Sequence, residues 1–153
     1  MKRMFCLAAV SAILCANPAN AEAPQGQGSA ALYIQKTNST PMRWSGVGEL
    51  RAQNDLCVIS DTGRFRLRVQ IAGIQQGAAI PDFEVTFTTT AGDRVTRRSG
   101  ESDVLVFDGR ATPVANCNGV INANLQFRFP EGGLSAAIAG NYLQQFILSV
   151  EPV

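Results

Sequence analysis

The chain has 153 residues, with 13 basic and 12 acidic side chains and a formal net charge of +1. This near balance argues against a nucleic-acid-binding protein, which needs a strong basic excess. The sequence contains no histidine, so it lacks the commonest general base and the commonest metal ligand in proteins. We therefore expect a protein that is not an enzyme and that holds neither a metal nor another cofactor.

The start of the chain has the three parts of a cleavable signal peptide. Lys2 and Arg3 precede an apolar stretch at 4–14, and a small residue, Ala21, marks the cleavage site. The apolar stretch is too short to span a bilayer as a helix, so we expect no stable membrane anchor. Removal of residues 1–21 leaves 11 basic and 12 acidic residues in a mature chain that suits one domain. The sequence predicts export to the periplasm, the cell surface or a secreted fibre.

The mature chain begins with residues 22–40, which combine a polar arm with a candidate strand. Residues 22–29 are rich in Pro, Gln and Gly and lack the apolar side chains needed for packing, so we expect a flexible arm. At 30–36, Leu32 and Ile34 fall on one side of an extended chain, which predicts a first strand.

Strong alternation marks the strands that follow. The clearest strand is 64–71, where four apolar side chains alternate with three arginines and a glutamine. Such alternation over a whole strand indicates one buried face and one wet face. The turn residues Asp61-Thr62-Gly63 predict a hairpin with a strand through 57–59. Further strands are predicted at 83–88, 104–107, 124–129 and 142–150, and the short apolar run at 104–107 is expected to be covered on both faces.

The spacing of these strands predicts the fold class. About six or seven short strands, separated by Gly, Pro, Asn and Asp turns, are typical of an antiparallel β-sandwich. A closed barrel uses similar strands and remains an alternative. We expect no helix beyond a single turn at 134–139, where flanking glycines limit its length. Residues 41–153 are thus predicted to form one all-β domain.

Two cysteines, Cys57 and Cys117, remain after the signal peptide is removed. In an oxidising compartment two thiols in one chain most simply pair, and the CxxC spacing or histidine of a redox or metal site is absent from the sequence. We therefore predict a disulfide. Because it closes a long loop, the chain-entropy model gives about 4 kcal/mol of stabilisation.

Four residues are candidates for surface binding. Arg64, Arg66 and Arg68 project from one strand face and are suited to an anionic glycan or phosphate surface. The alternative is a solvated face whose arginines pair with acids across the sheet. Trp44 is either a platform for stacking a sugar or, more commonly for a lone tryptophan, part of the core.

Three segments in order resemble the spore coat U family, which is similar to the pilin subunits of the archaic chaperone-usher pathway. They are the cysteine, strand and turn element at 56–67, the Asn116-Cys117 pair, and the Ala139-Gly140-Asn141-Tyr142 motif that leads into a last strand ending at Pro152. The resemblance covers roughly residues 42–152 and depends on these elements occurring in the right order along the chain.

The resemblance implies an immunoglobulin-like sandwich that serves as a subunit of an adhesive surface fibre, pilus or coat. Pilin-like domains are incomplete, and a neighbour's extended segment completes them by strand addition. On this interpretation Ala30, Leu32 and Ile34 are the donor residues, and the partners are like subunits and a periplasmic chaperone and usher. The segment at 30–36 can equally be the domain's own first strand.

A second function stays open at this point. A complete, monomeric sandwich in the periplasm would suit a module that binds a carbohydrate or an anionic ligand through Trp44 and the arginines of strand 64–71. The two hypotheses differ in the state of the sandwich, because strand addition needs an edge that another strand can join.

Overall fold

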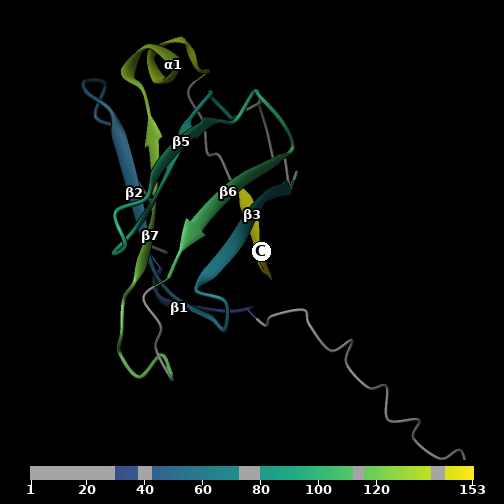
Figure 1. Ribbon diagram of the computed structural model, residues 1–153. Helices are drawn as coiled ribbons and strands as arrows, with labels where there is room; N and C mark the ends of the chain where they lie inside the picture. Colours follow the sequence, from purple (N-terminus) through teal and green to yellow (C-terminus); the bar gives the residue numbers. More distant parts are fainter. Residues whose placement is uncertain (1–29, 38–42, 73–79, 112–115, 139–143) are drawn as a thin grey trace, which may run out of the picture.

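The computed structural model describes residues 30–37, 43–72, 80–111, 116–138 and 144–153. Within these ranges the chain forms eight strands and one short helix, arranged in two antiparallel sheets (Figure 1). The two sheets share a single hydrophobic core. The all-β prediction and the two-sheet sandwich architecture are therefore confirmed, whereas the predicted signal peptide and the arm at 22–29 lie outside the described residues.

The larger sheet has five strands and the smaller has three. In spatial order, the five-stranded sheet contains β1 (Ala30–Thr37), β2 (Leu50–Ser60), β7 (Ala123–Phe129), β4 (Glu84–Thr89) and β5 (Arg94–Arg98). The three-stranded sheet contains β6 (Val104–Arg110), β3 (Arg64–Ala72) and β8 (Gln145–Pro152). All the pairings are antiparallel.

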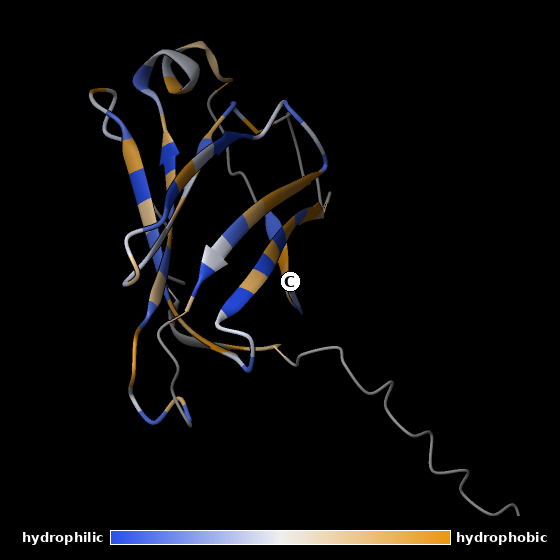
Figure 2. Cartoon of the chain, viewed as in Figure 1, coloured by the Kyte–Doolittle hydropathy of each residue, from blue (hydrophilic) through white to orange (hydrophobic). Residues whose placement is uncertain are grey.

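Alternation along the strands builds the core, as Figure 2 shows by the coloured bands of β3. Phe65, Leu67 and Val69 are buried, while the arginines between them face solvent. The facing sheet contributes its own alternate residues, of which Val85 and Phe87 are fully buried. Burial of apolar area is the main force that holds the two sheets together.

Several element boundaries differ from the sequence-based prediction. The turn at 61–63 is present, and Gly63 takes the positive φ of +69° that this turn needs. The predicted hairpin is wrong, because β2 and β3 do not pair and the turn leads the chain from the five-stranded sheet into the three-stranded one. The run at 104–107 is buried on one face only, through Leu105 and Phe107, because none of the described helices and strands covers the outer side of β6. Helix α1 occupies Glu131–Ala136, slightly earlier than the turn predicted at 134–139.

Strand β5 was not predicted. Its sequence, Arg94-Val95-Thr96-Arg97-Arg98, has a single apolar residue and carries little hydrophobic signal. It forms because β4 offers it a complete edge of backbone groups across a tight hairpin. The pairing partner, rather than the strand's own composition, determines this element.

The predicted disulfide joins Cys57 to Cys117, with their Cα atoms 5.8 Å apart. Next to it, the buried side chain of Asn122 acts as a substitute for a strand. Its Nδ2 donates to the carbonyl of Val58, and its Oδ1 accepts from the Val58 amide, both at 2.7 Å. These bonds continue the β2–β7 ladder past Ala123, where β7 begins.

The sandwich has two ends, which we name by what they carry. Strands β2 and β7 pair from Leu50 opposite Phe129 to Leu56 opposite Ala123. The α1 end carries α1 and the loop 44–48 that precedes β2. The disulfide end carries the segment 116–122 and the β2–β3 turn.

Candidate functional site: the flank formed by β1 and β8

The sandwich has two flanks, each made of one edge strand from either sheet. Strands β5 and β6 lie together on one flank, and β1 and β8 lie together on the other. Edge strands present backbone N–H and C=O groups that can template pairing with another chain, so proteins normally protect them. The two flanks of this molecule differ in how they are protected.

Arginine side chains guard the flank formed by β5 and β6. Arg97 lies opposite the core residue Val85, so it stands on the inward side of β5. Its Nε donates a long hydrogen bond of 3.5 Å to the carbonyl of Val106 on β6. An inward-pointing charge on an edge strand discourages pairing, because an added strand would desolvate it.

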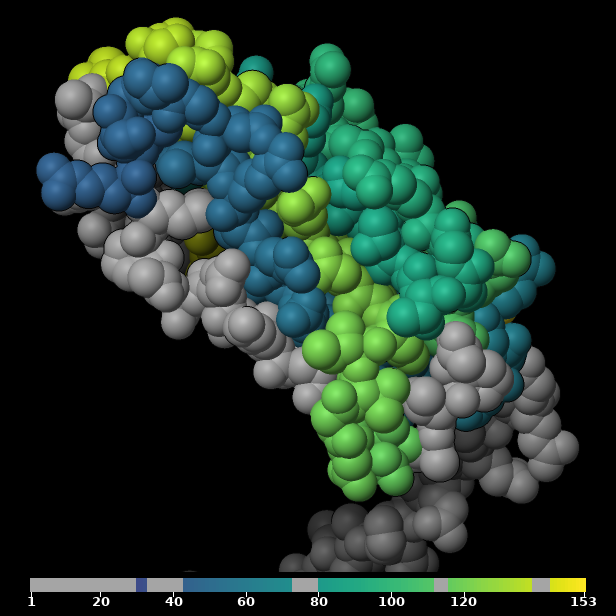
Figure 3. Space-filling view, turned by 90° about the vertical axis from the view of Figure 1, so that its left-hand side faces the viewer, coloured from purple at the N-terminus to yellow at the C-terminus, as the bar shows by residue number. Residues whose placement is uncertain are grey.

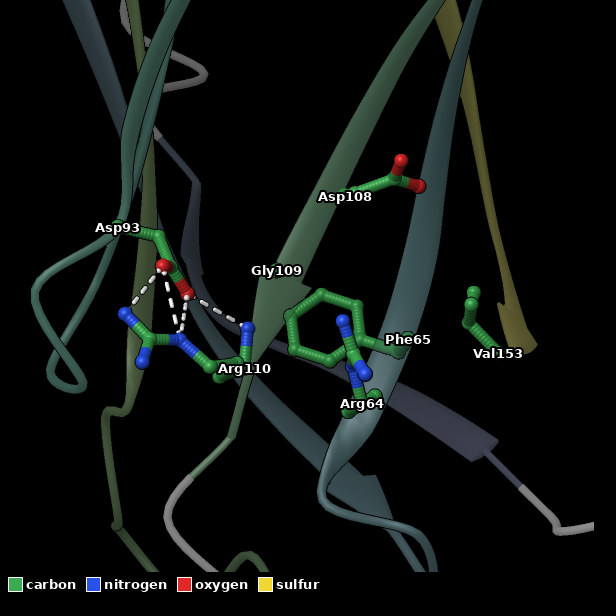
Figure 4. A pocket seen from close by; sticks show the side chains of 7 residues that line it. All are labelled: Arg64, Phe65, Asp93, Asp108, Gly109, Arg110 and Val153. Atoms are coloured by element: carbon green, nitrogen blue, oxygen red, sulfur yellow. Dashed lines mark hydrogen bonds and ion pairs between the residues drawn. The ribbon is translucent and has the colours of Figure 1, made fainter.

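A clasp between the sheets also closes this flank (Figure 4). Asp93, in the β4–β5 turn, accepts hydrogen bonds from Nη2 of Arg110 at 2.8 Å and from the Arg110 backbone amide at 2.7 Å. Thr89 Oγ1 donates to the same carboxylate at 3.1 Å. The side-chain hydrogen bond from Arg110, more than any other contact, holds the pKa of Asp93 below its ordinary value. The clasp joins the five-stranded sheet to the end of β6.

A shallow cavity of about 170 Å³ lies beside the clasp, and Figure 4 shows the residues that line it. These residues are Arg64, Phe65, Asp93, Asp108, Gly109, Arg110 and Val153. The hydrogen bond from Arg66 lowers the pKa of Asp108, as that from Arg110 lowers the pKa of Asp93. Each carboxylate is thus already paired with an arginine, and this pairing lowers its basicity.

The flank formed by β1 and β8 is apolar. Phe146, Leu148 and Val150 point inward from β8 and are only half-buried, whereas Leu67 and Val69 on the neighbouring β3 are completely buried. On β1, Ala30 and Leu32 are also half-buried and pack against the same core. When another segment covers partly exposed apolar side chains at an edge, apolar area is removed from water and the free energy falls.

Strand β8 has a partner on one side. It pairs with β3 from Gln145 opposite Ala72 to Pro152 opposite Phe65. Across the described ranges, no strand pairs with the other edge of β8, nor with the outer edge of β1. The flank thus combines two unpaired backbone edges with half-buried apolar side chains, and we call it the open flank.

Aromatic contacts fix the start of β8. The ring of Phe146 lies 4.5 Å from that of Phe127 and 5.6 Å from that of Phe83, measured between ring centroids. Phe83 also contacts Phe129 at 5.2 Å. Pairs at these separations stabilise beyond the area that they bury. They hold β8 in place although its outer edge has no partner among the described strands.

The segment predicted to be a donor strand pairs within its own chain in this structure. Ala30, Leu32 and Ile34 of β1 lie opposite Ser60, Val58 and Leu56 of β2. The segment therefore occupies the position of a first strand at the edge of the five-stranded sheet. Its donation to a second copy stays a prediction.

The residues predicted to bind at the surface lie in two separate places. Arg66 Nε donates to Asp108 at 2.7 Å, and Arg68 Nη2 lies 3.0 Å from Glu151, so both arginines pair across the three-stranded sheet. Arg64 is exposed at the mouth of the cavity. Trp44 belongs to the α1 end, where its indole N–H donates to the Gly48 carbonyl at 2.8 Å. The structure does not bring Trp44 and the arginines together.

A row of charges crosses the outer face of the five-stranded sheet, and sequence reasoning missed it. Glu49 pairs with Arg51 and Arg128, and Arg128 also pairs with Glu84. The hydrogen bond from Arg128 is the main cause that lowers the pKa of Glu49. The row depends on the register of β2, β7 and β4, which no local signal in the sequence reveals.

Among the described residues, no group of three or more Cys, Asp or Glu side chains is arranged to hold a metal ion. No helix in the described part of the chain is both long and apolar enough to cross a membrane.

The fold and the flank define a class of molecule, a two-sheet antiparallel β-sandwich with one guarded flank and one open flank. No family model, no curated protein and no solved structure matches the chain.

Proposed function

We propose that this protein is an exported, non-enzymatic structural or adhesive subunit of a surface fibre or coat, assembled by β-strand complementation at the open flank. The domain is an immunoglobulin-like sandwich that an extended segment of another copy completes. A periplasmic chaperone covers the flank before assembly, and an usher directs assembly. Like subunits are thus its main partners.

The single observation that carries the proposal is the difference between the two flanks. Arg97 and the clasp of Asp93 with Arg110 protect one side of the sandwich. The other side leaves Leu148 and its neighbours half-buried along the unpaired edge of β8. Natural sheets protect edges against unwanted pairing, so an apolar, unguarded edge favours a role in strand addition.

Strand addition would both pair the backbone edge of this flank and cover its half-buried apolar side chains. An added strand pairs its backbone with β8 and covers the inward side chains, as strand-recognition modes generally do. The disulfide between Cys57 and Cys117 supports the proposed route, because such bonds persist in oxidising compartments such as the periplasm.

The test introduces an inward-pointing arginine, like Arg97 of the guarded flank, into an edge strand of the open flank. Leu148→Arg places an inward-pointing charge on β8, and Val95→Arg places the same charge on β5. Both residues are half-buried and pack against the core from an edge strand, so their effects on folding are matched. The mature protein is produced with a co-expressed periplasmic chaperone-usher system, and its mass is measured by size exclusion with light scattering.

We expect wild type and Val95→Arg to form oligomers or chaperone complexes and Leu148→Arg to remain monomeric. A wild-type protein that stays monomeric with and without the chaperone system would contradict the proposal. Equal assembly of both variants would contradict the assignment to the open flank. The native disulfide and the circular dichroism spectrum confirm that each variant is folded.

A further inference from the structure

Exposed aliphatic side chains gather at the two ends of the sandwich. Val47 and Ile138 are 76% and 74% exposed at the α1 end, and Val120 and Ile121 are 37% and 48% exposed at the disulfide end. Figure 3 shows both places, with segment 116–122 as a green lobe at the lower end and the blue and yellow-green atoms around α1 at the upper end. These residues take no part in the core or in the open flank.

The loop that carries Val47 is braced. Gly46 and Gly48 have φ values of +94° and +80°, a conformation that other residues rarely adopt. The indole of Trp44 donates to the Gly48 carbonyl at 2.8 Å and closes the loop. Val47 lies between these two glycines, inside the loop that the Trp44 hydrogen bond closes.

The opposite loop is braced as well. Cys117 anchors its start through the disulfide, and the two side-chain bonds of Asn122 to Val58 anchor its end. Between these anchors, Gly119 turns the chain with a φ of +75° and is followed by Val120 and Ile121. The fold thus holds Val120 and Ile121 between two anchors at the disulfide end, and Val47 lies in a closed loop at the α1 end.

We propose that these two ends form a contact between successive copies of this chain, with Val47 and Ile138 of one copy packed against Val120 and Ile121 of the next. The contact joins different surfaces, so it is heterologous and repeats along a line. This proposal rests on the proposed function, because strand addition brings the copies together.

The direction of β8 indicates why the ends should meet. The strand runs from Gln145 at the α1 end to Pro152 at the disulfide end, as its pairing with Ala72 and Phe65 shows. A partner strand that lies along β8 leaves the flank at one of these ends. The body of its own copy therefore lies beyond that end, next to the exposed aliphatic residues.

The small size of each patch favours a tethered copy as the occupant. Two aliphatic side chains per end bury too little area to overcome the entropy lost when two free proteins associate. Copies already linked by a strand meet at an effective concentration in the millimolar range, at which a weak contact is populated. A free partner protein would need a larger patch.

The test is crosslinking between engineered cysteines in assembled protein. The double variant Val47→Cys, Val120→Cys places one thiol at each end, and a short bismaleimide links thiols that lie close together. Single variants, Val47→Cys and Val120→Cys, control for contacts between identical ends. The double variant Thr96→Cys, Val120→Cys replaces one end by the exposed outer face of β5.

We expect strand-linked oligomers of the first double variant to give a ladder of covalent multimers, while the single variants and the Thr96 control remain uncrosslinked. Adding Leu148→Arg should abolish the ladder, since the tether is lost. Size exclusion before crosslinking separates the two proposals. Oligomers that do not crosslink would overturn the end contact and leave strand addition intact, whereas absence of oligomers would overturn both. Dimers of a single variant would show contact between identical ends and would also overturn the proposal.

Discussion

At the scale of single residues, the most demanding position is Asn122. It is 3% exposed, and its amide satisfies both backbone groups of Val58 on the neighbouring strand. A buried amide is tolerated only when its hydrogen bonds are complete, and here the native partners are two backbone groups that have few alternatives. Asn122 lies just before β7 begins, and its side chain takes the place of further strand pairing with β2. The chain that precedes it is therefore not part of the sheet, and its Cys117 bonds to Cys57.

Replacing Asn122 should therefore destabilise the fold strongly. Asn122→Ala leaves the amide and carbonyl of Val58 buried without partners, and we expect a loss of about 2–4 kcal/mol in the free energy of unfolding. Urea denaturation of the oxidised protein measures it. Asn118→Ala, on the exposed part of the same loop, should change the value by less than about 0.5 kcal/mol. Similar losses for both variants would contradict the role assigned to Asn122.

Gly109 predicts a second residue-scale effect. A Cβ atom at this position would lie 2.8 Å from the ring of Phe87 and 2.9 Å from the ring of Phe65, both fully buried. Gly109→Ala should cost about 1–3 kcal/mol, as overpacking of a core does. The matched control is Gly100→Ala, whose Cβ would meet nothing within 4 Å. Equal melting temperatures for the two variants would rule out the crowding at Gly109.

Three carboxylates that are paired with arginines predict how the free energy of unfolding depends on acid pH. The pKa values of Glu49, Asp93 and Asp108 lie below the ordinary values of 4.5 for Glu and 3.8 for Asp. A folded-state pKa lower than the unfolded one gives stability that is present above the unfolded value and lost as pH falls through the folded value. The free energy of unfolding should thus be flat near neutral pH and fall below about pH 4.

The Asp93 clasp should account for part of this acid sensitivity. Asp93→Asn and Arg110→Gln should each lower stability at pH 7 and reduce its further loss between pH 5 and pH 2, because the clasp is already broken. The double variant should lose less than the sum of the single losses, since both remove the same contact. Urea titrations at several pH values measure all three. A pH profile of Asp93→Asn identical in shape to wild type would refute the assignment.

At the scale of elements, β3 and β5 show what local sequence can and cannot predict. The alternation of Phe65, Leu67 and Val69 defines β3 without reference to any other strand. The arginine-rich β5 exists through its pairing with β4 and has no pattern of its own. The same holds for the open flank, because which strands become edges depends on the order of strands in space. Sequence reasoning identified the apolar residues of β8 but not that they are half-buried.

Removing the inward charge of β5 should weaken the guarded flank. Arg97→Val makes the inward side of this edge strand apolar, and we expect association that increases with protein concentration. Arg94→Val removes an equal charge from the outward side of the same strand and should leave the protein as soluble as wild type. Light scattering across a concentration series compares the two. Identical behaviour would show that net charge, rather than the position of Arg97, controls solubility.

At the scale of the whole molecule, the disulfide stabilises a chain whose two sheets are both completed late in the sequence. β7 and β8 supply central and edge strands of the two sheets, and Cys117 lies just before β7. The pairing of the cysteines was predictable from their number and from the predicted signal peptide. The position of the disulfide beside Asn122 was not predictable, because Asn122 and its hydrogen-bond partner Val58 are 64 residues apart in the sequence.

Loss of the disulfide should lower stability throughout. The variant Cys57→Ala, Cys117→Ala should lose about 4 kcal/mol in the free energy of unfolding, because the unfolded chain regains the freedom of a long closed loop. Urea denaturation under oxidising conditions provides the comparison with wild type. A loss below about 1 kcal/mol would show that residual structure in the unfolded chain already restricts this loop.

The guarded flank has a consequence for the topology of any polymer that forms. A subunit that accepts strands on both flanks is multivalent, and its polymers branch as readily as they lengthen. Arg97 and the clasp of Asp93 with Arg110 remove one of these edges. In the proposed polymer each copy would then accept strands at the open flank and not at the guarded one. Such a polymer would grow from one side of the sandwich, so Arg97 and Arg110 would favour an unbranched fibre over a crosslinked network.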